Sequence, residues 1–154
     1  MIQPFGTVRQ LPTVLSYEAR RYARQRLNHL LAETRMLYAL YKKHHWKKHH
    51  WLVRGATFHQ LHLLLDQHAS AQLAVVDALA ERVQSLGGVA VGDPRHAAEI
   101  TSVPRPPDGG EEVPAMVSRL LEAHETNLVG ARGAAHRAPP GGARRRRQQR
   151  PPRL

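Results

Sequence analysis

The sequence predicts an all-α domain, and two observations carry that prediction. Apolar residues recur at intervals of three and four over long stretches, which is the period of an amphipathic helix. Glycines and prolines, which interrupt helices, collect between these stretches and after them. With 154 residues, 42% hydrophobic content, two Phe and two Trp, the chain can form one modest and mainly aliphatic core.

The first two helices are expected over residues 13–52 and 56–86, separated by Gly55. The apolar positions of the first are Leu27, Leu30, Leu31, Leu37, Leu40 and Tyr41. Those of the second are Leu61, Leu64, Leu65, Leu73, Val76, Leu79, Ala80 and Val83. Gly87 and Gly88 predict where the second helix ends, because glycine readily adopts the left-handed conformation that closes a helix.

The second half of the chain begins with a connection over residues 89–110, which is rich in Pro and Gly and carries one short helix over 95–101. A third long helix is expected over 111–135, since Glu111, Glu112 and Pro114 suit a first turn. Residues 1–137 therefore form the predicted domain. Residues 138–154 contain mainly Pro, Gly, Ala and Arg, and we expect a disordered basic tail.

The formal net charge of +11 is concentrated in that tail. Residues 1–130 hold 15 basic and 12 acidic residues, whereas the remaining eight basic residues follow residue 130. The run of Arg144, Arg145, Arg146 and Arg147 predicts contact with DNA phosphates through counterion release. The alternative is a basic tail that binds any polyanion weakly, and the lack of interleaved aromatic residues favours it.

The absence of cysteine excludes a disulfide framework, a thiolate zinc site and a Cys nucleophile. The amino terminus does not read as a secretory signal, and no stretch approaches the roughly 20 apolar residues of a membrane span. We therefore expect a soluble, cytoplasmic protein, with association with the nucleoid if DNA is bound.

Five candidate metal ligands, His50, His62, Asp66, Asp77 and Glu81, lie within a 32-residue stretch. Each of the two pairs in the second helix has a spacing of four residues, and all four side chains fall within roughly 100° of one helix face. Asp66 and Asp77 are nevertheless about 16 Å apart along the axis. A single chain cannot bring both pairs to one metal ion.

Two antiparallel copies of this helix remove the difficulty. Packed about a twofold axis near Ala71 and Gln72, they place His62 opposite the partner's Glu81, and His50 can fold back over the turn at Gly55. Imidazole and carboxylate ligands suit ferrous iron, with manganese and zinc as competitors. The alternative is that the acids are solvated helix residues and that His62 is a packing residue.

The segments HHWLVRGATFHQLHLLLD from His49 and DALAERVQSLGGVAVG from Asp77 resemble the Dps family of DNA-protection and iron-storage proteins. The resemblance extends from PFGTVRQLP at Pro4 to HETNLVGAR, which ends at Arg132. It implies a ferritin-like four-helix-bundle subunit and a hollow shell of twelve chains. The shell would store ferric mineral.

The same resemblance implies ferroxidase centres at dimer interfaces, where hydrogen peroxide is the preferred oxidant of ferrous iron. His50, His62 and Asp66 would come from one chain and Asp77 and Glu81 from its partner, with Trp51 beside the site. Consumption of ferrous iron and peroxide would protect DNA even without binding it.

Two features depart from the family pattern. Residues 42–46 and 47–51 form a tandem repeat of KKHHW, whereas the family has room for one copy. Five extra residues turn a helix by a net 140° or so and lengthen it by about 7.5 Å, which would move the upstream leucines out of the core unless the helix bulges. His44, His45, His49 and His50 would form an added metal-binding tract, or the repeat is a duplication without purpose.

The second departure is the lack of a fourth bundle helix after residue 137, which would leave apolar surface uncovered. The leading hypothesis is therefore a Dps-type ferroxidase and iron-storage protein whose cofactor is iron. The alternatives are a nucleic-acid-binding protein that acts through its Arg-rich tail with a vestigial iron site, and a defective family member that does not assemble.

Overall fold

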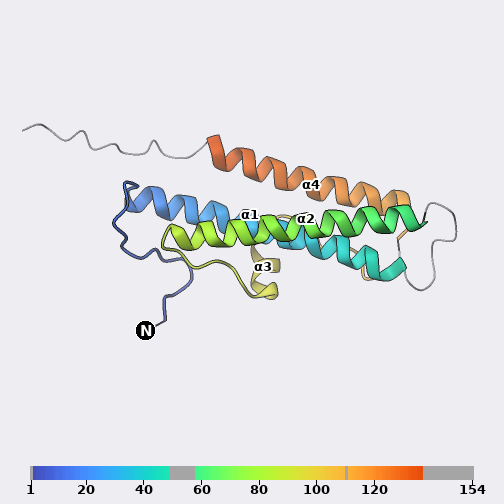
Figure 1. Ribbon diagram of the computed structural model, residues 1–154, viewed down its shortest axis with the longest axis horizontal. Helices are drawn as coiled ribbons and strands as arrows, with labels where there is room; N and C mark the ends of the chain where they lie inside the picture. Colours follow the sequence, from blue (N-terminus) through green and yellow to red (C-terminus); the bar gives the residue numbers. More distant parts are fainter. Residues whose placement is uncertain (1, 49–57, 110, 137–154) are drawn as a thin grey trace, which may run out of the picture.

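The computed structural model describes residues 2–48, 58–109 and 111–136, and every regular element in these ranges is a helix (Figure 1). The elements are α1 (Tyr17–Lys48), α2 (Phe58–Ser85), α3 (Pro94–Ile100) and α4 (Val113–His136). The all-α prediction is confirmed. The predicted tail, and with it the question of a further helix, concerns residues outside these ranges.

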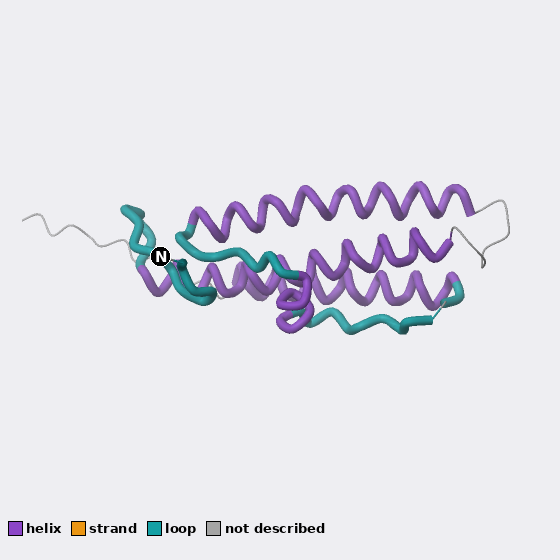
Figure 2. The backbone as a smooth tube through the Cα atoms, turned by 90° about the horizontal axis from the view of Figure 1, so that it is seen from below, coloured by secondary structure: helices purple, strands orange, loops and turns teal. Residues whose placement is uncertain are grey.

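The three long helices run side by side, and α1 is antiparallel to both α2 and α4 (Figures 1 and 2). Helix α1 contacts each of the other three helices. The segment that follows α2 returns along the length of the molecule and carries α3 before it reaches α4 (Figure 2). Helix α1 is therefore the central element against which the described parts of the chain pack.

Helix α1 begins at Tyr17, four residues later than predicted. The backbone N–H of Ala19 donates to Ser16 Oγ at 3.2 Å, and the N–H of Arg20 donates to the Ser16 carbonyl. A serine in this position satisfies N–H groups that have no partner within the first turn. The prediction of a start at Thr13 was wrong, because it rested on the scarcity of helix-breaking Gly and Pro after that residue. It did not take account of Ser16 as the capping residue.

The tandem repeat does not displace the core leucines of α1. Leu31, Leu37 and Leu40 are all buried, while Leu27 and Leu30 are half-buried. Helix α1 continues through the first copy of KKHHW and the first two residues of the second, up to Lys48. The upstream leucines therefore stay in the core although α1 is a continuous helix up to Lys48.

The end of α2 follows from its two glycines. Gly87 has a φ of +82°, and the N–H of Gly88 donates to the Val83 carbonyl at 3.0 Å. These are the features of a Schellman motif, in which glycine avoids the strain that a Cβ atom would cause. The Gly87 carbonyl accepts a hydrogen bond from the N–H of Arg9 at 2.8 Å, so the N-terminal segment is attached to this end of α2.

The remaining boundaries differ from the predicted ones by one or two residues. Asp93 caps α3 by accepting a hydrogen bond from the N–H of Arg95 at 2.8 Å, and Pro94 occupies the first turn. Helix α4 begins at Val113 rather than at residue 111, since the Glu112 carbonyl accepts from the N–H of Met116.

The main core lies where α1, α2 and α4 meet. It consists of the buried residues Leu37, Leu40, Tyr41, Leu65, Ala69, Val103, Met116, Leu120 and Ala123. Leu64 and Leu73, predicted to lie on the buried face of α2, are instead 45% exposed. That prediction was wrong for these two residues, because they lie outside the cluster that α2 forms with α1 and α4. No helix within the described ranges is long and apolar enough to cross a membrane.

Candidate metal centre

Helix α2 carries four of the five predicted metal ligands. His62 and Asp66 lie one turn apart near its start and are half-buried, whereas Asp77 and Glu81 lie one turn apart near its end and are exposed. The helix is uninterrupted between the two pairs, so they remain about 16 Å apart along its axis. The pairs therefore form two separate groups on one helix.

A single chain does not assemble these groups into a metal site. Across the parts of the chain that the structure describes, no three His, Asp or Glu side chains are arranged to hold a metal ion. His50 and Trp51 lie outside the described residues, as do Arg144, Arg145, Arg146 and Arg147. Their predicted roles stay predictions.

Asp66 makes an ion pair that the sequence did not reveal. Its Oδ1 atom accepts a hydrogen bond from Lys42 Nζ of α1 at 3.0 Å, and both side chains are partly exposed. Nearby, the Nδ1 atom of His62 is buried. The carboxylate predicted to bind a metal ion is thus held by an ammonium group in the single chain.

The chain is similar to several ferritin-like proteins. Residues 24–138 match the ferritin family, described as a ferritin-like domain. The uncharacterized protein in the bpoA2 5′ region of Kitasatospora aureofaciens is 66% identical over 136 residues, which cover 88% of this chain and 87% of that protein. The nutrient stress-induced DNA-binding protein of a Nostoc species is 31% identical and covers 90% of this chain and 72% of its own length.

Among solved structures, DpsC from Streptomyces coelicolor superposes with a TM-score of 0.83 at 64% identity, over 90% of this chain and 77% of that one. A Dps homologue from Halobacterium salinarum superposes with a TM-score of 0.78 at 28% identity, over 87% of this chain and 72% of that one. The chain belongs to the Dps family. Its fold is accordingly ferritin-like.

In this Dps chain, a second group of metal-binding residue types lies between the three long helices. The buried Tyr41 hydroxyl of α1 contacts Nδ1 of His68 on α2 at 3.2 Å and also contacts Nε2 of His124 on α4. Burial raises the pKa of Tyr41, and burial together with the nearby His68 lowers the pKa of His124. The sequence does not reveal this group, because Tyr41 occupies an apolar position of the first predicted helix.

A buried carboxylate lies farther along the interface between α1 and α4. Glu33 is 1% exposed, and its Oε1 atom lies 3.2 Å from Nε2 of His29. Burial raises the pKa of Glu33, while the electrostatic interaction with the nearby His29 lowers it. Gly130 of α4 passes close by, and a Cβ atom added there would lie 2.8 Å from Glu33 Oε2. The absence of a side chain at Gly130 thus makes room for this carboxylate.

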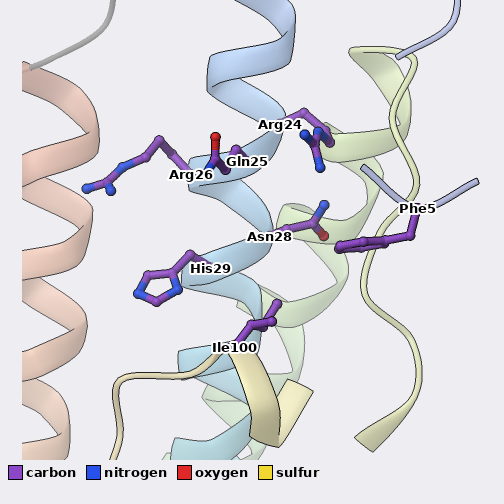
Figure 3. A pocket seen from close by; sticks show the side chains of 7 residues that line it. All are labelled: Phe5, Arg24, Gln25, Arg26, Asn28, His29 and Ile100. Atoms are coloured by element: carbon purple, nitrogen blue, oxygen red, sulfur yellow. The ribbon is translucent and has the colours of Figure 1, made fainter. Parts of the chain in front are cut away.

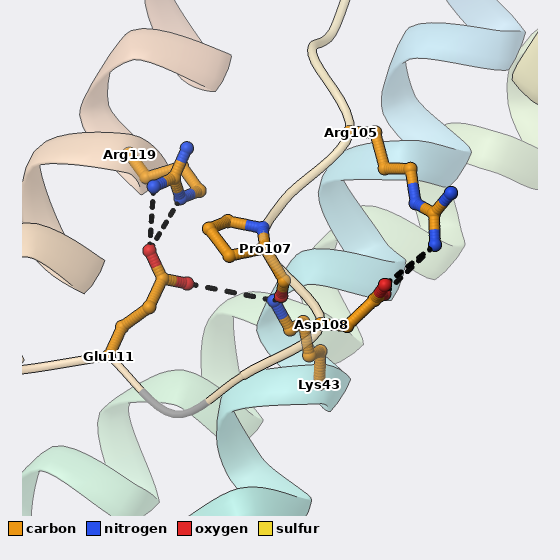
Figure 4. A network of polar contacts seen from close by, with 6 residues as sticks. All are labelled: Lys43, Arg105, Pro107, Asp108, Glu111 and Arg119. Carbon is orange, nitrogen blue, oxygen red and sulfur yellow. Dashed lines mark hydrogen bonds and ion pairs between the residues drawn. The ribbon is translucent and has the colours of Figure 1, made fainter.

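A network around Glu111 attaches the connection before α4 to the bundle (Figure 4). Glu111 Oε1 accepts hydrogen bonds from Nε and Nη2 of Arg119 at 2.8 and 2.6 Å, and Oε2 lies 3.6 Å from Lys43 Nζ. Lys43 also donates to the Pro107 carbonyl. Because each carboxylate oxygen faces a cation, we assign this network to structure rather than to metal binding.

A recess of about 530 Å³ borders the N-terminal half of α1. Its lining includes Phe5, Arg24 and Asn28 on one side of α1, whereas Arg26 and His29 point from the other side toward α4 (Figure 3). Because these polar groups do not converge on one point, the recess is not the predicted metal centre. Burial lowers the pKa of Arg24, and its guanidinium carbon lies 6.0 Å from the centre of the Phe5 ring.

Proposed function

We propose that two copies of this chain form dinuclear sites that oxidise ferrous iron, preferentially with hydrogen peroxide, and that a shell of twelve chains stores the ferric product. Iron is the substrate of this reaction. Two ferrous ions supply the two electrons that reduce one peroxide molecule, which takes up two protons and leaves as two water molecules. Removal of both reactants would protect DNA from hydroxyl radicals.

The observation that carries the proposal is the arrangement of ligands on α2. The pairs His62 with Glu81 and Asp66 with Asp77 share one midpoint, between residues 71 and 72. When two copies of α2 cross antiparallel at that midpoint, each pair of one copy meets the complementary pair of the other. Both sites are then completed together.

The surface of α2 near that midpoint supports the same arrangement. Leu73 lies within about 20° of His62 around the helix and is 45% exposed, so a second chain could cover it. Ser70 is exposed on the same face and is small enough for two helices to approach closely. The ligand-bearing face thus has an apolar centre for a partner to cover.

The KKHHW repeat offers two histidines for the remaining ligand. His50 is the predicted ligand from its position before Gly55. Because Lys42 lies opposite Asp66 and the two helices are antiparallel, position 45 of α1 falls at the level of residues 62–63 of α2. That register supports His45 as a rival to His50 for the same role.

The names of relatives support the biological setting. The relative from Nostoc is named a nutrient stress-induced DNA-binding protein, and another from Halobacterium salinarum is named a DNA protection during starvation protein. The latter is 49% identical over 68 residues, which are 44% of this chain and 35% of that protein. A cytoplasmic protein that associates with the nucleoid under stress fits these names.

Stopped-flow measurement of ferrous oxidation by peroxide tests the assigned site. The double variant His62→Ala, Asp66→Ala should lose the rapid phase of oxidation. Of the two single variants His45→Ala and His50→Ala, the one that removes the true ligand should lose it as well. A matched control is His96→Ala, Glu99→Ala, which removes one imidazole and one carboxylate from α3. Wild-type oxidation in the His62, Asp66 variant would reject the site.

The Arg-rich tail supports a second candidate function, direct binding of DNA through Arg144, Arg145, Arg146 and Arg147. Deletion of residues 138–154 should then abolish the retardation of DNA in a gel at moderate salt while ferrous oxidation continues. Unchanged retardation would exclude the tail as the DNA-binding element.

A further inference from the structure

Three potential metal ligands from three different helices converge on one point in the core. The Tyr41 hydroxyl of α1 lies 3.2 Å from Nδ1 of His68 and is also hydrogen-bonded to Nε2 of His124. The Tyr41 ring meets both imidazoles edge to face, with centroid distances of 5.5 and 5.7 Å. The hydroxyl oxygen therefore contacts one imidazole nitrogen from α2 and one from α4.

One separation in this group matches that of two ligands on one metal ion. Imidazole nitrogens bind zinc at about 2.0–2.1 Å, so neighbouring ligands of a tetrahedral ion are about 3.3 Å apart. The 3.2 Å separation of Tyr41 Oη and His68 Nδ1 fits that value.

We propose that Tyr41, His68 and His124 bind a divalent transition-metal ion of the zinc class, with water as the fourth ligand. Two imidazoles and one phenolate form a donor set that suits zinc, cobalt(II) or copper(II) better than magnesium or calcium. On binding, the Tyr41 oxygen forms a bond to the metal ion and releases its proton to solvent. The site lies within one chain and needs no partner.

This site is separate from the proposed iron centre. His68 follows Asp66 by two residues, which places it about 160° away around α2. His68 is exposed and His124 is half-buried, so an ion can approach the two imidazoles while Tyr41 closes the inner side. The neighbouring α4 residues Leu121 and Leu128 are 64% and 53% exposed, so no described element covers this side of the bundle.

The proposal is tested by titrating the purified full-length chain with cobalt(II), whose tetrahedral complexes absorb strongly in the visible range. The titration is made in the His62→Ala, Asp66→Ala background with His44, His45, His49 and His50 replaced by Gln, so that neither the iron centre nor the histidine tract contributes. We expect one tetrahedral ion per chain, accompanied by the ultraviolet signature of a phenolate. Zinc should displace the cobalt.

The variants Tyr41→Phe, His68→Gln and His124→Gln each remove one ligand while keeping a similar volume. Each should weaken cobalt binding by roughly tenfold or more. His96→Gln is the matched control, because His96 lies on α3 against Phe5. Circular dichroism checks that each variant is folded.

Wild-type cobalt binding in any one folded variant would overturn the three-ligand site. So would an absence of tetrahedral cobalt in the background variant. Neither result bears on ferrous oxidation at His62 and Asp66, which is measured separately, so the two proposals fail independently.

Discussion

Lys42 Nζ lies 3.0 Å from Oδ1 of Asp66, and this ion pair joins α1 to the part of α2 that carries the proposed iron ligands. It gives Asp66 a partner before any metal ion arrives. A partly exposed ion pair contributes about 0.2–1 kcal/mol, so the competition it offers to a metal ion is modest.

Replacement of Lys42 by methionine should therefore make ferrous iron bind more tightly. The expected change is a decrease of about 1.5- to fivefold in the ferrous concentration that gives half-maximal oxidation, which corresponds to the strength of such a pair. Lys42→Arg keeps the charge and is the control. An unchanged or weaker response to ferrous iron in Lys42→Met would show that Lys42 does not compete at Asp66.

Replacement of Leu73 by glutamate should prevent the twofold contact of α2 with its partner. A leucine that becomes buried contributes about 1.5–3 kcal/mol, and a twofold interface contains two of them. Light scattering coupled to size exclusion should show a smaller particle. Leu64→Glu is the matched control, because Leu64 has the same 45% exposure but lies on another face of α2. Equal effects of the two substitutions would reject the proposed dimer.

Replacement of Glu33 by glutamine should stabilise the fold at neutral pH. Burial raises the pKa of Glu33 in the folded state, so the ionised carboxylate costs stability above that pKa. The cost disappears as the pH falls through the folded pKa toward the unfolded value near 4.3. Urea unfolding at neutral pH and near pH 4 should show an advantage for Glu33→Gln that shrinks at the lower pH.

The exposed Glu125 on α4 provides a control for this experiment, since Glu125→Gln should change stability little at either pH. An advantage of Glu33→Gln that stays constant with pH would mean that ionisation of Glu33 is not its cause.

Replacement of Gly130 by alanine should destabilise the packing of α4 on α1. The new Cβ atom would lie 2.8 Å from Glu33 Oε2, and Glu33 is too deeply buried to move aside easily. The expected cost is about 1–3 kcal/mol of unfolding free energy. Thermal unfolding followed by circular dichroism measures it.

Gly133 offers the contrasting case on the same helix. A Cβ atom there would lie 3.4 Å from Nη2 of Arg26, the flexible end of a long side chain. Gly133→Ala should therefore gain up to roughly 1 kcal/mol from helix propensity. If both substitutions stabilise the protein, the close contact with Glu33 is not a constraint.

Local signals in the sequence predict most of the helical framework. The periodicity of apolar residues predicts α2, and Gly87 marks its end because only glycine adopts a φ of +82° without strain. The predicted start of α1 was too early because residues 13–16 are also compatible with a helix. Only the structure shows that Ser16 caps α1, by accepting a hydrogen bond from the N–H of Ala19. The spacing of the four α2 ligands also follows directly from the chain order.

Contacts between helices required the tertiary structure. The sequence could not show that Lys42 meets Asp66, that Tyr41 lies between His68 and His124, or that Gly130 makes room for Glu33. Helical periodicity determines which residues share a face of one helix. It does not determine the register and rotation of one helix against another, which depend on the packing of all their buried side chains together.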